Sequence, residues 1–150
     1  EPWALDTVAP IAPLNEAFNR FTRAGIENPI YPMFHFVVLA GAYAPYIGVQ
    51  FVAGNLENPS SEFPYGVADI KAFSQHLTLI ARLVSLLMGL GIVYSAYRIT
   101  EELAGSSAAF WAALSTSLIA PLAYYAKTSN LDVPYTFWVM LAAWVFVRIL

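Results

Sequence analysis

The strongest constraint on the fold of this chain is a long apolar run, residues 77–99, in which only Arg82 and Arg98 are charged. A helix needs roughly 20 apolar residues to cross the hydrocarbon core of a bilayer, which is about 30 Å thick. The run is therefore long enough to span a membrane. Two further apolar runs, residues 108–126 and 133–150, are also candidates. We predict three transmembrane helices at about these positions.

The composition agrees with lipid as the solvent of these runs. Hydrophobic residues make up 59% of the chain and charged residues 11%, whereas soluble domains carry about 25% charged residues. The net charge of −3 and the scattered basic residues exclude a nucleic-acid partner. The absence of cysteine excludes disulfides and thiolate metal sites. Because the chain starts without methionine and ends inside an apolar run, we expect it to be part of a longer multi-span protein.

The first 75 residues are harder to interpret. Residues 33–54 are apolar but contain one proline and three glycines, and residues 55–75 form a turn-rich loop. If residues 33–54 cross the membrane, residues 1–32 are cytoplasmic. If they lie along the outer leaflet, residues 1–75 form one extracytoplasmic loop with juxtamembrane helices, including an amphipathic segment at residues 14–23. The residues alone leave both topologies open.

The distribution of basic residues suggests an orientation. If the three predicted helices span, Arg98 and Arg148 lie at one face of the membrane and Lys127 at the other. The positive-inside rule makes the face with the two arginines cytoplasmic. Residues 55–75 and the short connection at residues 128–132 then lie together on the outer face. A second short connection, residues 100–107, fits antiparallel neighbours.

Three charged residues can be interpreted in two ways each. Asp6 is either a solvated aspartate in a turn before Pro10 or a reactive carboxylate. Asp132 precedes Pro134 and is either the N-cap of the next helix or a site residue. Arg82 lies within an apolar run, where it either snorkels to the interface or binds a phosphate with its planar fork of donors.

No recognised catalytic or metal-binding motif accompanies these residues. His35 and His76 are far apart and lack the spacing of metal ligands. The sequence contains no glycine-rich phosphate loop, nucleophile elbow or paired acid–base motif. Several Tyr and Trp residues, among them Tyr31 and Trp138, are typical of the aromatic belts at membrane interfaces.

The order of several short elements nevertheless resembles the polytopic glycosyltransferases of the GT-C type that use lipid-phosphate sugars, such as protein O-mannosyltransferases and lipid A aminoarabinose transferases. The matching elements are, in order, Asp6 in WALDTVAP, residues 31–35 (YPMFH), residues 81–85 (ARLVS), residues 103–105 (LAG) and residues 130–134 (NLDVP). The resemblance covers nearly the whole chain and depends on order and spacing, since no single element is specific.

Two positions depart from the family pattern. Thr7 stands where many members have a glutamate beside the aspartate, and Met33 replaces the second proline of the usual pair. Ile30 occupies the neighbourhood from which some relatives bind a divalent metal through a glutamate, so the metal requirement is left open. The resemblance also implies that residues 1–75 form a large outer loop with juxtamembrane helices and that residues 76–150 carry the spans.

The resemblance implies transfer of a sugar from a polyprenyl-phosphate donor to an extracytoplasmic lipid, glycan or protein acceptor, with inversion. The localisation implied is a prokaryotic inner membrane with the active site on the outer face. Asp6 and Asp132 would be the catalytic carboxylates, with Asp6 as the base. Substrate would be bound by five further residues: Arg82, Tyr31, His35, Lys127 and Asn130. The alternative is a non-catalytic protein, either a transporter segment or an assembly subunit.

Overall fold

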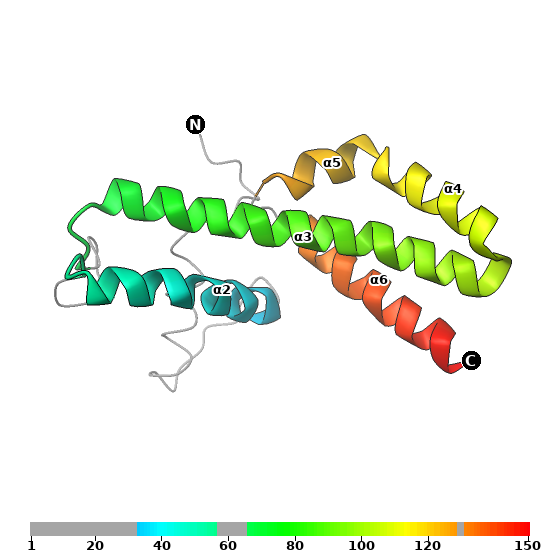
Figure 1. The fold of residues 1–150 in the computed structure, drawn as a ribbon, viewed down its shortest axis with the longest axis horizontal. Coiled ribbons are helices and arrows are strands. Elements are labelled where there is room, and N and C mark those ends of the chain that lie inside the picture. Colours follow the sequence, from blue (N-terminus) through cyan, green and yellow to red (C-terminus); the bar gives the residue numbers. More distant parts are fainter. Residues whose placement is uncertain (1–32, 57–65, 129–130) are drawn as a thin grey trace. The chain divides into compact units, whose positions relative to one another are not determined.

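The computed structural model describes residues 33–56, 66–128 and 131–150. All the regular elements in these residues, apart from one isolated bridge, are helices (Figure 1): α2 (Met33–Val52), α3 (Ile70–Ala104), α4 (Ser106–Ser117), α5 (Ala120–Ala126) and α6 (Asp132–Ile149). Three of them, α2, α3 and α6, are long and apolar enough to cross a membrane, and α4 with α5 would make a fourth span. The predicted all-α class is confirmed for this part of the chain, and the helices support an integral membrane protein.

The described residues belong to two compact units, an N-terminal unit within residues 33–81 and a C-terminal unit of residues 82–150, with α3 running through both. In the N-terminal unit, α2 turns back onto the start of α3. The Tyr46 ring stacks on His76 with 5.3 Å between centroids and lies 5.6 Å from Phe73. The Ala68 N–H donates to the Asn55 carbonyl at 3.2 Å, which joins the two ends of the connection.

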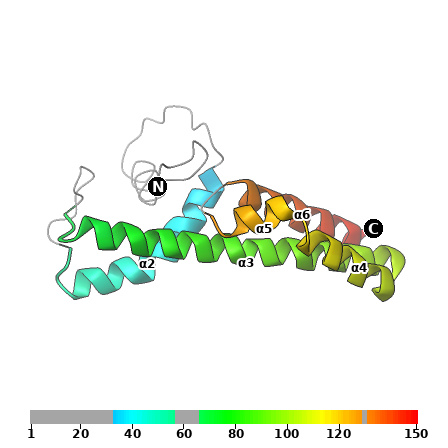
Figure 2. The same ribbon diagram turned by 90° about the horizontal axis from the view of Figure 1, so that it is seen from above.

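The expected irregularity of residues 33–54 takes the form of one helix with Pro45 inside it. Figure 2 shows that α2 changes direction along its length, which is the usual effect of a proline that removes one helical hydrogen bond. Phe34–Val52 qualifies by length and apolarity as a span. Both predicted topologies of this segment therefore remain open.

The helix α3 is longer than the predicted span at residues 77–99. It begins at Ile70 because Asp69 caps it, with the Asp69 Oδ1 accepting the Ala72 N–H at 3.0 Å. The predicted loop over residues 55–75 is therefore wrong in its last six positions, which are helical. At about 1.5 Å per residue α3 is about 52 Å long, well beyond the ~30 Å hydrocarbon core, so part of it lies outside the hydrocarbon.

The connection predicted at residues 100–107 is reduced to one residue. The helix α3 continues to Ala104 and α4 begins at Ser106, so that Gly105 alone makes the turn with φ 83°. A left-handed conformation of this kind favours glycine because any Cβ would be strained there. The predicted span at residues 108–126 is also modified, since α4 and α5 meet at an angle of 64°.

In the C-terminal unit, α6 packs in parallel along the second half of α3. A Cβ added to Gly89 would lie 3.0 Å from the Ala126 Cβ and 3.9 Å from the Val133 Cγ1, and a Cβ on Gly91 would overlap the Phe137 ring. Membrane helices approach closely where such small residues lie at the interface. The contacts progress in the same direction along both helices, because Gly89 and Gly91 meet Val133 and Phe137 near the start of α6 and Glu102 meets Trp144 farther along both helices.

Replacing Gly91 should test this close approach. Gly91→Ala places a Cβ against the Phe137 ring, and we expect the intact protein in detergent to lose about 1–3 kcal/mol of stability from overpacking. Gly48→Ala in α2 is the matched control because nothing lies within 4 Å of the added Cβ. Thermal unfolding curves of the two variants that coincide would contradict the packing of α3 on α6.

Candidate functional site

The charged residues of the C-terminal unit gather at the two ends of its helices. No residue in the ranges 83–97, 103–126 and 133–147 is charged. Because α6 lies parallel to α3, the charged residues that flank these ranges fall into two groups, one toward each end of the helices. We call Arg82, Lys127 and Asp132 the Asp132 end, and Arg98, Glu101, Glu102 and Arg148 the Arg98 end. Uncharged helical segments between two charged ends are the arrangement that a bilayer requires.

Trp144, one turn before Arg148, contacts Arg98, so Arg98 and Arg148 lie toward the same end of α3 and α6, as the predicted orientation requires. Lys127 lies at the opposite end, next to Ala126, which touches Gly89. The assignment of the Arg98 end to the cytoplasm remains a prediction.

Arg82 lies at the edge of the uncharged part of α3. Seven residues separate it from Gly89, so both are on the face of α3 that meets α5 and α6. The spacing from Arg98 corresponds to about 24 Å along the axis, close to the thickness of the hydrocarbon core. The Arg82 side chain is exposed and makes no ion pair or hydrogen bond with any residue of the described ranges. Its guanidinium can therefore reach headgroup phosphates from this boundary position.

Lys127 and Asp132 flank the connection between α5 and α6. Lys127 is exposed, and its Nζ lies 5.4 Å from the centroid of the Tyr124 ring. Asp132 is exposed and is the first residue of α6, while Leu131 occupies the N-cap position. The interpretation of Asp132 as the N-cap is therefore wrong by one residue. Its carboxylate still lies where the helix dipole favours negative charge.

The remaining predicted site residues are not joined to this group. Asp6, Tyr31 and Asn130 lie outside the described residues. His35 is buried in the N-terminal unit, with 2% of its surface exposed, and its Nδ1 has no hydrogen-bond partner there. In the part of the chain that the structure describes, no three His, Asp or Glu residues are grouped so that they could hold a metal ion.

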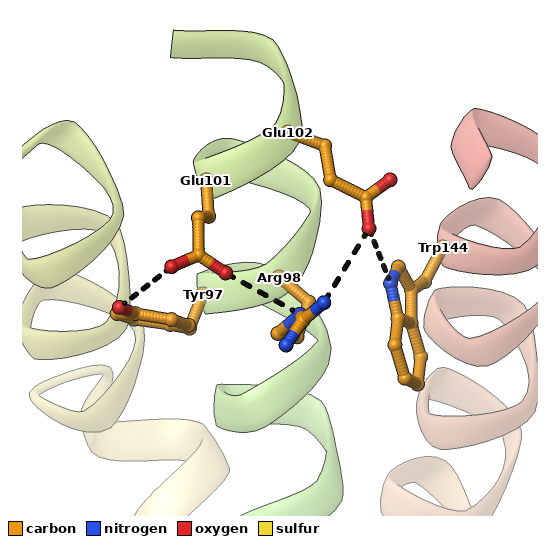
Figure 3. A network of polar contacts seen from close by, with 5 residues as sticks. All are labelled: Tyr97, Arg98, Glu101, Glu102 and Trp144. Carbon is orange, nitrogen blue, oxygen red and sulfur yellow. Dashed lines mark hydrogen bonds and ion pairs between the residues drawn. The ribbon is translucent and has the colours of Figure 1, made fainter. Parts of the chain in front are cut away.

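A polar network at the Arg98 end links α3 to α6 (Figure 3). Arg98 Nε lies 3.4 Å from the Glu101 carboxylate and Arg98 Nη2 lies 3.8 Å from that of Glu102. Tyr97 donates to Glu101 at 3.1 Å. Trp144 Nε1 on α6 donates to Glu102 at 3.3 Å, which is the hydrogen bond that crosses between the helices.

A cation–π contact and an edge-on aromatic contact also hold the Trp144 ring. The Arg98 guanidinium carbon lies 5.7 Å from its centroid, within the range of a cation–π contact, and Tyr94 packs against it edge-on at 5.6 Å. The ion pairs are partly exposed and individually weak, at about 0.2–0.5 kcal/mol each. Arg98 and Glu102 on α3 both contact Trp144 on α6, so the group links the two helices. We call these three residues the Trp144 clamp.

Sequence reasoning did not identify this network as a unit. Glu101 and Glu102 follow Arg98 by three and four residues, a spacing that predicts ion pairs on a helix. The participation of Trp144 carries no such local signal because 42 residues separate it from Glu102.

No protein-family model matches the chain, and neither a curated protein nor a solved structure does so. The strongest geometric element is the Asp132 end, where Lys127 and Asp132 adjoin the contacts of Gly89 with Ala126 and Val133, and Arg82 lies seven residues before Gly89, about 10 Å along α3.

Trp144 offers a test of the clamp. Trp144→Phe keeps an aromatic ring but removes the N–H that bonds Glu102 and weakens the contact with Arg98. We expect a loss of about 1 kcal/mol in the stability of the intact protein. Trp111→Phe is the control, because Trp111 is exposed on α4 and its ring contacts its neighbour Phe110. Equal unfolding temperatures for both variants in detergent would refute the clamp.

Proposed function

We propose that this chain belongs to a membrane glycosyltransferase that moves a sugar from a polyprenyl-phosphate donor to an extracytoplasmic acceptor. The observation that carries the proposal is the Asp132 end, where Arg82, Lys127 and Asp132 lie beyond the same ends of three uncharged segments. A lipid-linked phosphate sits at this depth of a membrane, because its polyprenyl chain occupies the hydrocarbon and its phosphate the interface. The resemblance in the order of sequence elements supports the same reaction.

The proposed reaction is a single displacement at the anomeric carbon. A carboxylate base takes the proton of the acceptor hydroxyl, whose oxygen forms the new glycosidic bond while the bond from the sugar to phosphate breaks. The phosphate leaves with the lipid, and the configuration of the sugar inverts. Asp6 is the proposed base, and the guanidinium of Arg82 is suited to offset the charge of the departing phosphate.

Asp132 and Lys127 have supporting roles in this proposal. Both side chains are exposed and flank one short connection, so they can border a pocket for a polar substrate. Asn130, within that connection, is proposed to contribute to the same pocket, with Tyr31 and His35 lining the path of the sugar or lipid.

A transporter segment is the second candidate, and the break between α4 and α5 favours it. Many transporters bind their substrates where spanning helices are interrupted. The two helices meet at 64° within a segment, residues 103–126, that contains no charged residue. A transporter of ions or charged solutes usually places ionisable groups at such a break. The absence of charged residues from 103–126 favours interfacial chemistry at the Asp132 end over transport of a charged solute.

Neutralising the carboxylates tests the transferase directly. With the full-length protein in membranes and radiolabelled polyprenyl-phosphate sugars, Asp6→Asn should lower transfer by about 10²–10⁴-fold because the base is lost. Asp132→Asn should also lower it. Asp69→Asn is the control, since Asn is as good an N-cap as Asp and preserves the start of α3. Transfer by Asp6→Asn at the native rate would remove the proposed base, and no transfer by the native protein with any such donor would remove the function.

Arg82 can be tested separately from the base. Arg82→Gln removes a charge-assisted contact with the lipid phosphate, so kcat/KM for the donor should fall by about 10–100-fold. Arg148→Gln removes an exposed arginine at the opposite end and should leave kcat/KM unchanged. Equal effects of the two substitutions would show that Arg82 does not contact the donor.

A further inference from the structure

The junction of α4 and α5 is an interrupted part of the helical backbone inside an uncharged segment. The helix α4 ends at Ser117, Leu118 and Ile119 are not helical, and α5 begins at Ala120 with Pro121 in its first turn. Pro121 has no N–H and cannot bond the carbonyl four residues earlier, which belongs to Ser117. The two helix axes therefore separate by 64° at this point.

The junction leaves main-chain groups without hydrogen bonds. The carbonyls of Ser117 and Leu118 accept none, and the N–H groups of Ala120 and Leu122 donate none, within the described ranges. The nearby hydroxyls do not supply the missing donors, because Thr116 Oγ1 bonds the Ala112 carbonyl and Ser117 Oγ the Leu114 carbonyl, both at 2.8 Å. Four backbone groups thus remain to be satisfied.

These groups lie too deep to be satisfied at the membrane surface. Five to ten residues separate them from Lys127, which corresponds to a depth of at most about 15 Å below the Asp132 end. On the other side, the whole of α4, about 18 Å long, separates them from the Arg98 end. An unsatisfied peptide group in hydrocarbon costs several kcal/mol, so irregular backbone at this depth does not face lipid.

The direction of the groups favours water as their partner. The carbonyls at the end of α4 point along the axis of α4, whereas the N–H groups at the start of α5 point back along the axis of α5. Since these axes differ by 64°, the two sets of groups point in different directions. Several water molecules can satisfy them, because each molecule can take a different donor or acceptor. Leu118 is 74% exposed and Ile119 is 49% exposed, so the chain's own side chains leave the junction accessible.

From these observations we infer that the α4–α5 junction borders a water-filled cavity that enters the membrane from the Asp132 end. The cavity would take small polar ligands that offer both donors and acceptors, such as water itself or the hydroxyl groups of a sugar or acceptor. This inference stands independently of sugar transfer, because it follows from the unpaired backbone groups, the depth and the exposure of the junction.

Thiol labelling tests the cavity. The chain contains no cysteine, so single cysteines can be placed in the full-length protein once any cysteines outside this chain are replaced. Leu118→Cys and Ser115→Cys should react with a membrane-impermeant methanethiosulfonate, because a thiol ionises readily only in contact with water. Both should label within about tenfold of the rate of Lys127→Cys at the Asp132 end.

The matched negative control is Val139→Cys. Val139 is 68% exposed and lies six residues past Val133 on α6, at about the depth of the junction. It should label about 100-fold more slowly than Leu118→Cys, because no broken backbone draws water to it. Equal rates for Val139→Cys and Leu118→Cys would overturn the cavity.

Hydrogen–deuterium exchange of the unmodified protein gives a second measurement that no variant can disturb. The amide protons of Ala120 and Leu122 should exchange much faster than those in the middle of α6, because they contact water and donate no backbone hydrogen bond within the described ranges. Slow exchange at Ala120 and Leu122 would overturn the cavity and indicate that another helix of the protein covers the junction.

Discussion

The C-terminal unit depends on the requirement that charged groups and free peptide groups stay out of the hydrocarbon. Residues 83–97 and 133–147 are uncharged and bounded by ionisable residues with the same spacing in α3 and α6. Parallel packing of the two helices then brings their charges to common ends without any further interaction. The network around Trp144 forms toward one end, and Arg82, Lys127 and Asp132 lie toward the other, with Arg82 seven residues before Gly89, which contacts Ala126 and Val133. The apolar segments thus position the charged groups of both ends.

Much of this arrangement could be predicted because it follows from local properties of the sequence. The apolar runs gave the helical class, and the positions of Arg98 and Arg148 at the ends of two runs gave their common end. The start of α3 was also encoded locally, since Asp69 is a good N-cap residue. It was missed because the mixed sequence of residues 70–76 is not apolar enough to suggest a span. Helix ends depend on such caps more than on hydropathy.

Other features depend on contacts or on competition between local preferences. The pairing of Trp144 with Glu102 joins positions 42 residues apart and has no sequence signature. Pro45 and Pro121 both lie in apolar runs, yet the backbone around them differs. Pro45 remains inside the continuous helix α2, whereas at Pro121 the helix is broken. Gly105 could replace an expected eight-residue connection because one left-handed residue suffices to end a helix. The side of the membrane and the role of Asp6 remain predictions.

The junction of α4 and α5 changes how the Asp132 end should be understood. A site made only of Arg82, Lys127 and Asp132 would be a flat interfacial surface that attracts phosphate but offers little shape to a sugar. A cavity reaching the carbonyls of Ser117 and Leu118 would add acceptors below that surface, and sugar hydroxyls can donate to such carbonyls. The same broken helix that favours a transporter is therefore equally suited to an enzyme with a lipid-linked substrate. What separates them is whether a carboxylate removes the proton of an acceptor hydroxyl, so that a new glycosidic bond forms, or only attracts a solute that passes unchanged.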